Sequence, residues 1–230
     1  MSAGPIHRLH RRFWQKMRWT YFQLFQRHRH NRLVLERAAG RPLLILPEVF
    51  NPTLFFTSEF MVASFNERLI PPGSRVLDMG TGSGIGAIFA AQWAGAVTAV
   101  DINPAAVRCA TINVLLNHLE GCVDVRQGDL FTAVPGEHFD IILFNPPYFP
   151  GDPQNMLDYA FYSIDIIPRF AAQATDHLTD QGAILLLLSS DTAVADILHL
   201  FDEQGFAASI VARQKMPGET ILLYRLVCMR

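Results

Sequence analysis

Val76-Leu77-Asp78-Met79-Gly80-Thr81-Gly82-Ser83-Gly84-Ile85-Gly86 is the stretch of this chain that decides its fold. A short apolar run leads into closely spaced glycines, and a helix-like sequence follows as far as Trp93. Glycines at a strand-to-helix turn let the backbone approach a ligand closely, because they carry no Cβ. The stretch therefore predicts a parallel α/β unit with a ligand-binding turn at the carboxyl end of its first strand.

A second strand is predicted over residues 97–101, and it ends in Asp101. An acid at this point can accept hydrogen bonds from both hydroxyls of a ribose. A dinucleotide-binding turn would show the same arrangement. Asp78 inside the first strand argues against a dinucleotide, because a carboxylate beside the turn would repel a pyrophosphate and would suit a cationic or amino-acid-bearing ligand.

The third motif is Asn145-Pro146-Pro147-Tyr148, which follows the apolar run 139–144. An Asn at the end of a buried strand can direct its side-chain carbonyl into the cleft above a parallel sheet. The prolines stiffen the turn by fixing φ, and the Tyr adds a flat face. These features suit the holding of a planar amino group. The structural alternative is a Pro-rich turn capped by Asn.

In these motifs the chain resembles the class I AdoMet-dependent methyltransferases of the Asn-Pro-Pro-Tyr group, over roughly residues 49–227. Within that group it is most similar to the release-factor-type N5-glutamine methyltransferases. The resemblance implies S-adenosyl-L-methionine as the cofactor and catalytic roles for Asn145, Pro146, Pro147 and Tyr148. It implies cofactor contacts by Asp78, Gly80, Thr81, Gly82, Gly84, Asp101, Ile102, Asp129, Leu130 and Asn145.

The resemblance also assigns roles to the three acids. Asp101 would hold the ribose, Asp129 the adenine amino group, and Asp78 the amino-acid end of the cofactor, through water. In the catalytic loop we expect the Asn145 side-chain oxygen to accept one N–H of the methyl acceptor and the Pro146 carbonyl to accept the other. This increases the electron density on the acceptor nitrogen and fits the positive charge that develops in the transition state. Tyr148 would stack on the planar acceptor.

The rest of the chain alternates between strand-like and helix-like segments. Strands are predicted near residues 75–79, 97–101, 122–126, 139–144, 183–189, 206–212 and 220–227, and helices near 84–94, 104–118, 163–178 and 191–204. Alternation of this kind predicts an α/β fold with a doubly wound, mostly parallel seven-stranded sheet, the methyltransferase variant of the Rossmann-like fold. The last two strands have no helix between them and predict an antiparallel C-terminal hairpin.

The N-terminal part has a different character. Residues 5–38 predict one or two helices with one apolar face, ended by Gly40-Arg41-Pro42, and a short strand follows over 43–46. We therefore expect two parts, a basic helical N-terminal extension over 1–48 and an AdoMet-dependent methyltransferase domain over 49–230.

Charge also divides the chain. Residues 1–42 contain ten Lys or Arg and one acid, although the whole chain has a net charge of −2. The basic extension could pack on the catalytic domain, contact RNA or a ribosomal surface, or lie on a membrane surface. Farther along, Val49-Phe50-Asn51-Pro52 resembles the segment that precedes the catalytic domain in release-factor-type enzymes. In that family the segment runs on into acids and Thr near the cofactor, and by resemblance Thr57-Ser58-Glu59 could play this part after the extra residues 53–56. The same tripeptide also predicts the capped start of a helix that continues to Ile70, which is the interpretation preferred here.

Composition excludes several other classes of protein. The three cysteines form no pairing framework, which favours a reducing cytosol, and no His or Cys spacing predicts a metal site. No apolar run reaches the roughly 18 residues that a membrane span needs. We therefore expect a cytoplasmic enzyme without a metal or a transmembrane segment.

The identity of the methyl acceptor stays open at this point. A protein glutamine side chain is the first candidate, because of the similarity to release-factor-type enzymes. The basic N-terminal residues favour the adenine or guanine amino groups of RNA, since arginines bind phosphates in any sequence. A small-molecule amine and a non-catalytic AdoMet-binding scaffold are further alternatives. The chain has no room for the target-reading domain of a DNA-modifying enzyme.

Overall fold

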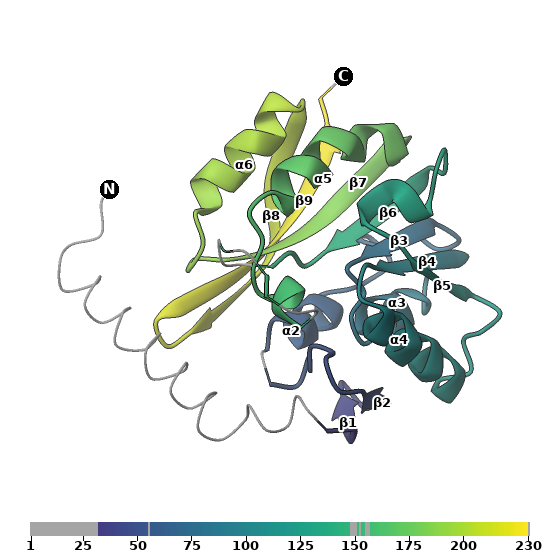
Figure 1. The fold of residues 1–230 in the computed structure, drawn as a ribbon. Helices are drawn as coiled ribbons and strands as arrows, with labels where there is room; N and C mark the ends of the chain where they lie inside the picture. Colours follow the sequence, from purple (N-terminus) through teal and green to yellow (C-terminus); the bar gives the residue numbers. More distant parts are fainter. Residues whose placement is uncertain (1–31, 55, 148–150, 152, 155–156, 230) are drawn as a thin grey trace.

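The computed structural model describes residues 32–54, 56–147, 151, 153–154 and 157–229 (Figure 1). The strands are β1 (Val34–Ala38), β2 (Arg41–Ile45), β3 (Arg75–Met79), β4 (Ala96–Asp101), β5 (Val123–Gln127), β6 (Phe139–Phe144), β7 (Leu178–Ser189), β8 (Phe206–Met216) and β9 (Glu219–Cys228). The α-helices are α2 (Thr57–Ala63), α3 (Ile85–Ala90), α4 (Pro104–Leu116), α5 (Ile166–Ala174) and α6 (Val194–Glu203). Short 3₁₀ helices are η3 (Leu130–Ala133), η4 (Asp158–Ala160) and η5 (Thr175–His177).

Seven strands form one sheet in the order β5-β4-β3-β6-β7-β9-β8. The strands from β5 to β7 in this order run parallel, and β9 pairs antiparallel with both β7 and β8. The predicted mixed sheet with an antiparallel C-terminal hairpin is therefore confirmed. The predicted helix over 163–178 is shorter than expected, because the chain has already entered β7 at Leu178.

Helices cover both faces of the sheet, with α3 and α4 on one side and α5 and α6 on the other (Figure 1). Successive side chains of a strand point to opposite faces, so each buried strand serves two apolar clusters. In β7, Leu185 and Leu187 belong to the cluster beneath α3 and α4, whereas Ile184 and Leu186 belong to the cluster beneath α5 and α6. This two-sided burial explains the continuous apolar runs of the central strands.

The N-terminal end of the described chain is a hairpin and not a helix. β1 and β2 pair antiparallel, and the two residues between them, Ala39 and Gly40, have φ angles of 44° and 86°. The prediction of helix for residues 34–38 is therefore wrong, and the predicted strand begins at Arg41. The helices predicted within residues 5–31 lie outside the described residues, and the boundary predicted at residue 48 stays a prediction.

The side chain of Asn113 in α4 holds the hairpin against the domain. Its Oδ1 accepts the Leu44 N–H at 2.7 Å, and its Nδ2 donates to the Leu44 carbonyl at 2.7 Å and to the Ser83 carbonyl at 2.9 Å. Leu43 and Ile45 lie in the same apolar cluster as α3. Asn113 therefore provides hydrogen-bond partners for backbone groups of β2 and joins this strand to the glycine-rich turn.

Helix α2 ends at Ala63, seven residues before the predicted end at Ile70. The Asn66 side chain accepts the N–H groups of Arg68 at 3.0 Å and Leu69 at 3.2 Å. A side chain that caps the following backbone in this way competes with helix formation. The chain consequently turns several residues before the Pro-Pro-Gly stop.

Two further findings concern membrane spans and metal sites, and both apply to the described residues alone. None of the helices in that part of the chain is long and apolar enough to cross a membrane. Among the same residues, no group of three His, Cys, Asp or Glu side chains could hold a metal ion.

Candidate active site

The pairing register brings three predicted site residues side by side. Met79 of β3 pairs with Val100 of β4 on one side and with Phe144 of β6 on the other. The residues that follow them are Gly80, Asp101 and Asn145. Since neighbouring strands lie about 4.8 Å apart, these residues form one row across the carboxyl ends of three strands.

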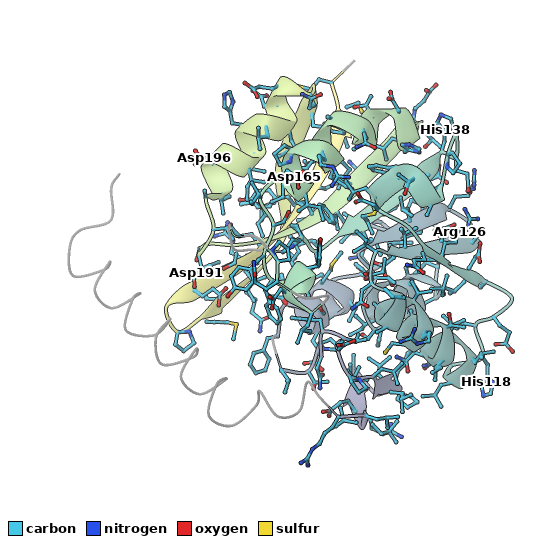
Figure 2. All side chains as sticks on the ribbon, in the orientation of Figure 1. His118, Arg126, His138, Asp165, Asp191 and Asp196 are labelled. Atoms are coloured by element: carbon cyan, nitrogen blue, oxygen red, sulfur yellow. The ribbon has the colours of Figure 1, made fainter. Side chains whose placement is uncertain are left out.

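The row lies at the point where the chain reverses its direction across the sheet. From β3 the chain adds β4 and β5 on one side, and it then adds β6 and β7 on the other. Open α/β sheets bind ligands outside the carboxyl ends of the strands at this point. Figure 2 labels His138, which precedes the parallel strand β6, and Asp191, which follows β7, so the two labels mark the amino and carboxyl ends of these strands. The candidate site is at the carboxyl ends, on the side of Asp191.

The glycine turn leaves open space beside its backbone. Gly80, Gly82 and Gly84 have φ angles of 68°, 56° and 85°, which L side chains rarely adopt. A Cβ added to Gly80 or Gly82 would meet no protein atom within 4 Å. At Gly84 it would lie 3.2 Å from the backbone of Ala110 in α4. The first two glycines therefore provide room for a ligand, and the third allows close packing of helices.

Asp78 lies beneath this turn and not on its surface, with 6% of the residue exposed. Its Oδ2 accepts the Thr81 hydroxyl at 2.6 Å and the Ala87 N–H at 2.8 Å, at the start of α3. Burial raises the pKa of Asp78 to about 6, although these two hydrogen bonds act in the opposite direction. A Cβ on Gly86 would lie 2.5 Å from Asp78 Oδ1. Asp78 therefore fixes the turn and occupies the space that Gly86 leaves.

Asp101 also binds the glycine turn. Its Oδ2 accepts the Gly82 N–H at 2.8 Å, and its Oδ1 accepts the Asn103 N–H at 2.9 Å. Burial raises the pKa of Asp101, and the backbone N–H groups partly oppose this effect. Each carboxylate oxygen can accept a second hydrogen bond, so this half-buried side chain can still accept ribose hydroxyls. The following residue, Ile102, is half-buried.

Asp129 has a partner that the sequence did not indicate. It follows β5, and its Oδ2 is bound by the Arg169 guanidinium of α5. Arg169 Nε also lies near the Asp165 carboxylate. The hydrogen bond to Asp129 and the negative charges of both carboxylates raise the pKa of the Arg169 guanidinium. The next residue, Leu130, is buried with a φ angle of 51°. Asp129 is 40 residues from Arg169 along the chain, so no local pattern could reveal the pair.

Asn145 is half-buried at the end of β6, and Pro146 behind it is buried. The Asn145 Nδ2 donates to the hydroxyl oxygen of Ser58 at 3.3 Å. Ser58 is the second residue of α2 and is 87 residues away along the chain, so its bond to Asn145 was not predicted. Pro147 is half-buried, and Tyr148 lies outside the described residues.

These residues fit S-adenosyl-L-methionine. The open space beside Gly80 and Gly82 admits a ligand to the backbone, and Asp101 lies one strand away with acceptor capacity for hydroxyls. Asp129 follows β5, the strand next to β4 on the side away from β3, where the adenine would lie if the ribose is held by Asp101. The order of the turn and the two acids across β3, β4 and β5 thus matches the order of the parts of the cofactor.

Comparison with known proteins agrees with this geometry. The family model of the methyltransferase small domain matches residues 43–218. The chain is 32% identical over 193 residues to a provisionally named protein N5-glutamine methyltransferase of Methanocaldococcus jannaschii, over 80% of this chain and 94% of that protein. It is 35% identical over 178 residues to the release factor glutamine methyltransferase of Koribacter versatilis, over 70% of this chain and 61% of the relative.

The fold has counterparts among solved structures. The T. thermophilus 16S rRNA N2 G1207 methyltransferase RsmC, in complex with AdoMet and guanosine, superposes with a TM-score of 0.63 at 24% identity. The match covers 84% of this chain and 49% of that chain. With a family model over most of its length and two relatives above 30% identity, the chain belongs to the methyltransferase small domain family and is an AdoMet-dependent N-methyltransferase.

Proposed function

We propose that this enzyme methylates the side-chain amide nitrogen of a glutamine in a protein that resembles a translation release factor. The observation that supports the proposal is the row Asp101, Gly80 and Asn145, in which Asn145 follows the strand next to the one that leads into the glycine turn. Both relatives with the longest matches reported above are named as glutamine methyltransferases.

Several residues would hold the cofactor. The backbone at Gly80 and Gly82 lines its path, Asp101 accepts the ribose hydroxyls, and Asp129 accepts the adenine amino group. Asp78 acts from beneath, by fixing the turn and through water at the amino-acid end. When bound, AdoMet supplies a methyl group on a positively charged sulfur, which leaves as a neutral thioether.

The acceptor amide is a poor nucleophile, because its nitrogen lone pair is delocalised into the carbonyl group. In our proposal the Asn145 Oδ1 accepts one acceptor N–H and the Pro146 carbonyl accepts the other. Both interactions strengthen as positive charge develops on nitrogen, so they stabilise the transition state more than the ground state. The nitrogen forms the new bond to carbon, and water then removes a proton that methylation has made acidic. No strong general base is required.

The test combines cofactor binding with transfer of a labelled methyl group. Asn145→Ala should lower kcat for a release-factor substrate by about 100-fold or more, as for the loss of a group that stabilises developing charge, while AdoMet affinity changes little. Isothermal titration measures that affinity, and label transfer to purified release factors measures kcat. Full turnover by Asn145→Ala would rule out the proposed role of this amide.

RNA is the second candidate acceptor. Residues 1–31 contain seven Lys or Arg and no Asp or Glu, a composition that favours phosphate binding. The same label-transfer experiment on total RNA distinguishes the two, since incorporation into nuclease-sensitive material would support an adenine or guanine amino group. Transfer to neither macromolecule would leave a small-molecule amine.

The cellular location forms part of the same proposal. Cys109, Cys122 and Cys228 are all free thiols in the structure. Unpaired cysteines are typical of reducing compartments, which supports a cytoplasmic enzyme that meets its protein or RNA substrate there.

A further inference from the structure

We infer that Ser58 is a positioning residue that sets the orientation of the Asn145 side-chain amide. The inference rests on the proposed function, in which the oxygen of that amide must face the acceptor. It assigns a role in methyl transfer to α2, a helix that is distant from β6 along the chain and whose first residues were expected to serve as a cap.

Ser58 does not act as a helix cap, although its sequence context predicts one. The N-cap position of α2 is taken by Phe56, which makes no side-chain cap hydrogen bond. Ser58 is instead buried, with 7% of the residue exposed. Its hydroxyl oxygen accepts the hydrogen bond from Asn145 Nδ2 at 3.3 Å. A buried hydroxyl directed at another part of the chain requires an explanation other than capping.

The helix gives this hydroxyl a fixed position. Met61 and Val62, one turn farther along α2, are each 4% exposed and belong to the apolar cluster that also contains α3. Asn145 is fixed in turn at the end of β6, because Phe144 before it is 2% exposed and Pro146 after it is buried. The hydrogen bond therefore joins two well-packed elements, and its geometry follows from the packing of both.

The bond matters because the two ends of the Asn145 amide differ chemically. The oxygen only accepts and the nitrogen only donates, so rotation of the amide by about 180° would present the wrong group to an acceptor N–H. A serine hydroxyl can donate as well as accept, and in the observed orientation Ser58 accepts from Nδ2, so that Oδ1 is the end of the amide that is not used in this bond. Ser58 is thus argued to act through Asn145.

Ser58→Ala tests this role, with Ser64→Ala as the matched control. Ser64 is the C-cap residue that follows the same helix and donates its hydroxyl to the Phe60 carbonyl at 2.8 Å, so Ser64→Ala also deletes a hydroxyl that bonds to α2. Ser58→Ala should lower kcat about tenfold, which corresponds to about 1.4 kcal/mol, with the KM of the acceptor and the Kd of AdoMet within about twofold. Ser58→Thr keeps the hydroxyl and should restore most of kcat.

A spectroscopic measurement makes the result independent of activity. In protein labelled with ¹⁵N-asparagine, the side-chain NH₂ signal that disappears in Asn145→Ala identifies Asn145. Ser58→Ala should shift this signal and speed its exchange with water, whereas Ser64→Ala should leave it in place. An unmoved signal in Ser58→Ala would overturn the inference, whatever the activity.

The two proposals can therefore fail separately. If Asn145→Ala keeps full activity, the proposed function is wrong even when the Ser58→Ala signal moves. If Asn145→Ala is inactive but Ser58→Ala has normal kcat, the proposed function stands and the positioning role is wrong. In the background of Asn145→Ala, the second change Ser58→Ala should have no further effect on residual activity, since coupled residues are not additive.

Discussion

The carboxylate of Asp78 and the missing side chain of Gly86 occupy neighbouring space beneath the glycine turn. Oδ1 of Asp78 would lie 2.5 Å from a Cβ at position 86, and Asp78 Cγ would lie 2.8 Å away. Gly86 is in α3 and its φ is not positive, so its backbone would otherwise suit alanine. The requirement for glycine at this position is therefore steric.

Gly86→Ala should destabilise the protein by about 1–3 kcal/mol, because overpacking at a buried carboxylate exceeds the roughly 1 kcal/mol that alanine gains in a helix. Urea denaturation measures the free energy of unfolding. Gly121→Ala is the control, since a Cβ there meets nothing within 4 Å. If both variants unfold at the same urea concentration, the contact with Asp78 has no energetic importance.

The raised pKa of Asp78 makes stability depend on pH. Its pKa is about 6 in the folded protein and near 3.8 when unfolded, so the native state prefers the protonated form. The stabilisation from that preference is complete below about pH 4 and is lost as pH rises through 6. The shift corresponds to roughly 3 kcal/mol.

Asp78→Asn removes this titration and can still accept hydrogen bonds through its amide oxygen. The stability of the variant relative to the wild type should therefore increase as the pH rises from 4 to 7. Unfolding free energies at several pH values measure the difference. Asp196→Asn, a change at an exposed site on α6, serves as the control. Parallel profiles for Asp78→Asn and wild type would contradict the assignment.

At the scale of elements, the β1–β2 hairpin is held to α4 by buried polar contacts, chiefly those of Asn113, with a further hydrogen bond from Asn117 to the Pro42 carbonyl. Asn113 is completely buried and bonds both backbone groups of Leu44. Asn113→Leu should destabilise the protein by about 2–4 kcal/mol, because it removes the bonds that Asn113 makes to the Leu44 N–H and the Ser83 carbonyl and leaves the Leu44 carbonyl only the weak Cys109 thiol donor. Thermal and urea unfolding measure this loss. A loss below about 1 kcal/mol would show that water replaces the side chain.

The sheet could be predicted because each of its strands carries its own apolar run and ends in a recognisable turn. The N-terminal β1–β2 hairpin could not be predicted. The segment Leu35-Glu36-Arg37 favours a helix locally, and it becomes a strand only through the packing of its neighbours Val34 and Ala38. The early end of α2 depends on the side chain of Asn66, a residue that occurs in many contexts.

The candidate site shows the same division between local and distant signals. Asp78, Asp101 and Asn145 could be named from the sequence because each lies inside or directly after an apolar strand. The bonds of Asn145 to Ser58 and of Asp129 to Arg169 could not be predicted, because the partners are 87 and 40 residues apart along the chain. Contacts between distant segments leave no periodic pattern in a single sequence.

At the scale of the whole molecule, charge is separated along the chain. The seven Lys or Arg of residues 1–31 contrast with a net negative charge over the remainder, because the whole chain has a net charge of −2. The hairpin belongs to the packed domain, so a deletion that tests the basic segment must end before Val34.

Deletion of residues 1–31 should remove any affinity for RNA and leave AdoMet binding unchanged. In the full chain, log K should fall linearly with log salt concentration, with a slope of about 0.7 for each phosphate contacted on a single strand. Fluorescence anisotropy at several salt concentrations measures this slope. RNA binding that is insensitive to salt, or that survives the deletion, would exclude the basic segment as its source.

The position of β9 between β7 and β8 has a consequence for synthesis of the protein. β8 is translated before β9, yet it pairs with no strand of the sheet except β9. A nascent chain that has reached β8 thus holds an eleven-residue strand that has nowhere to bind. The sheet can therefore be completed only after the ribosome has released β9, which lies between β7 and β8.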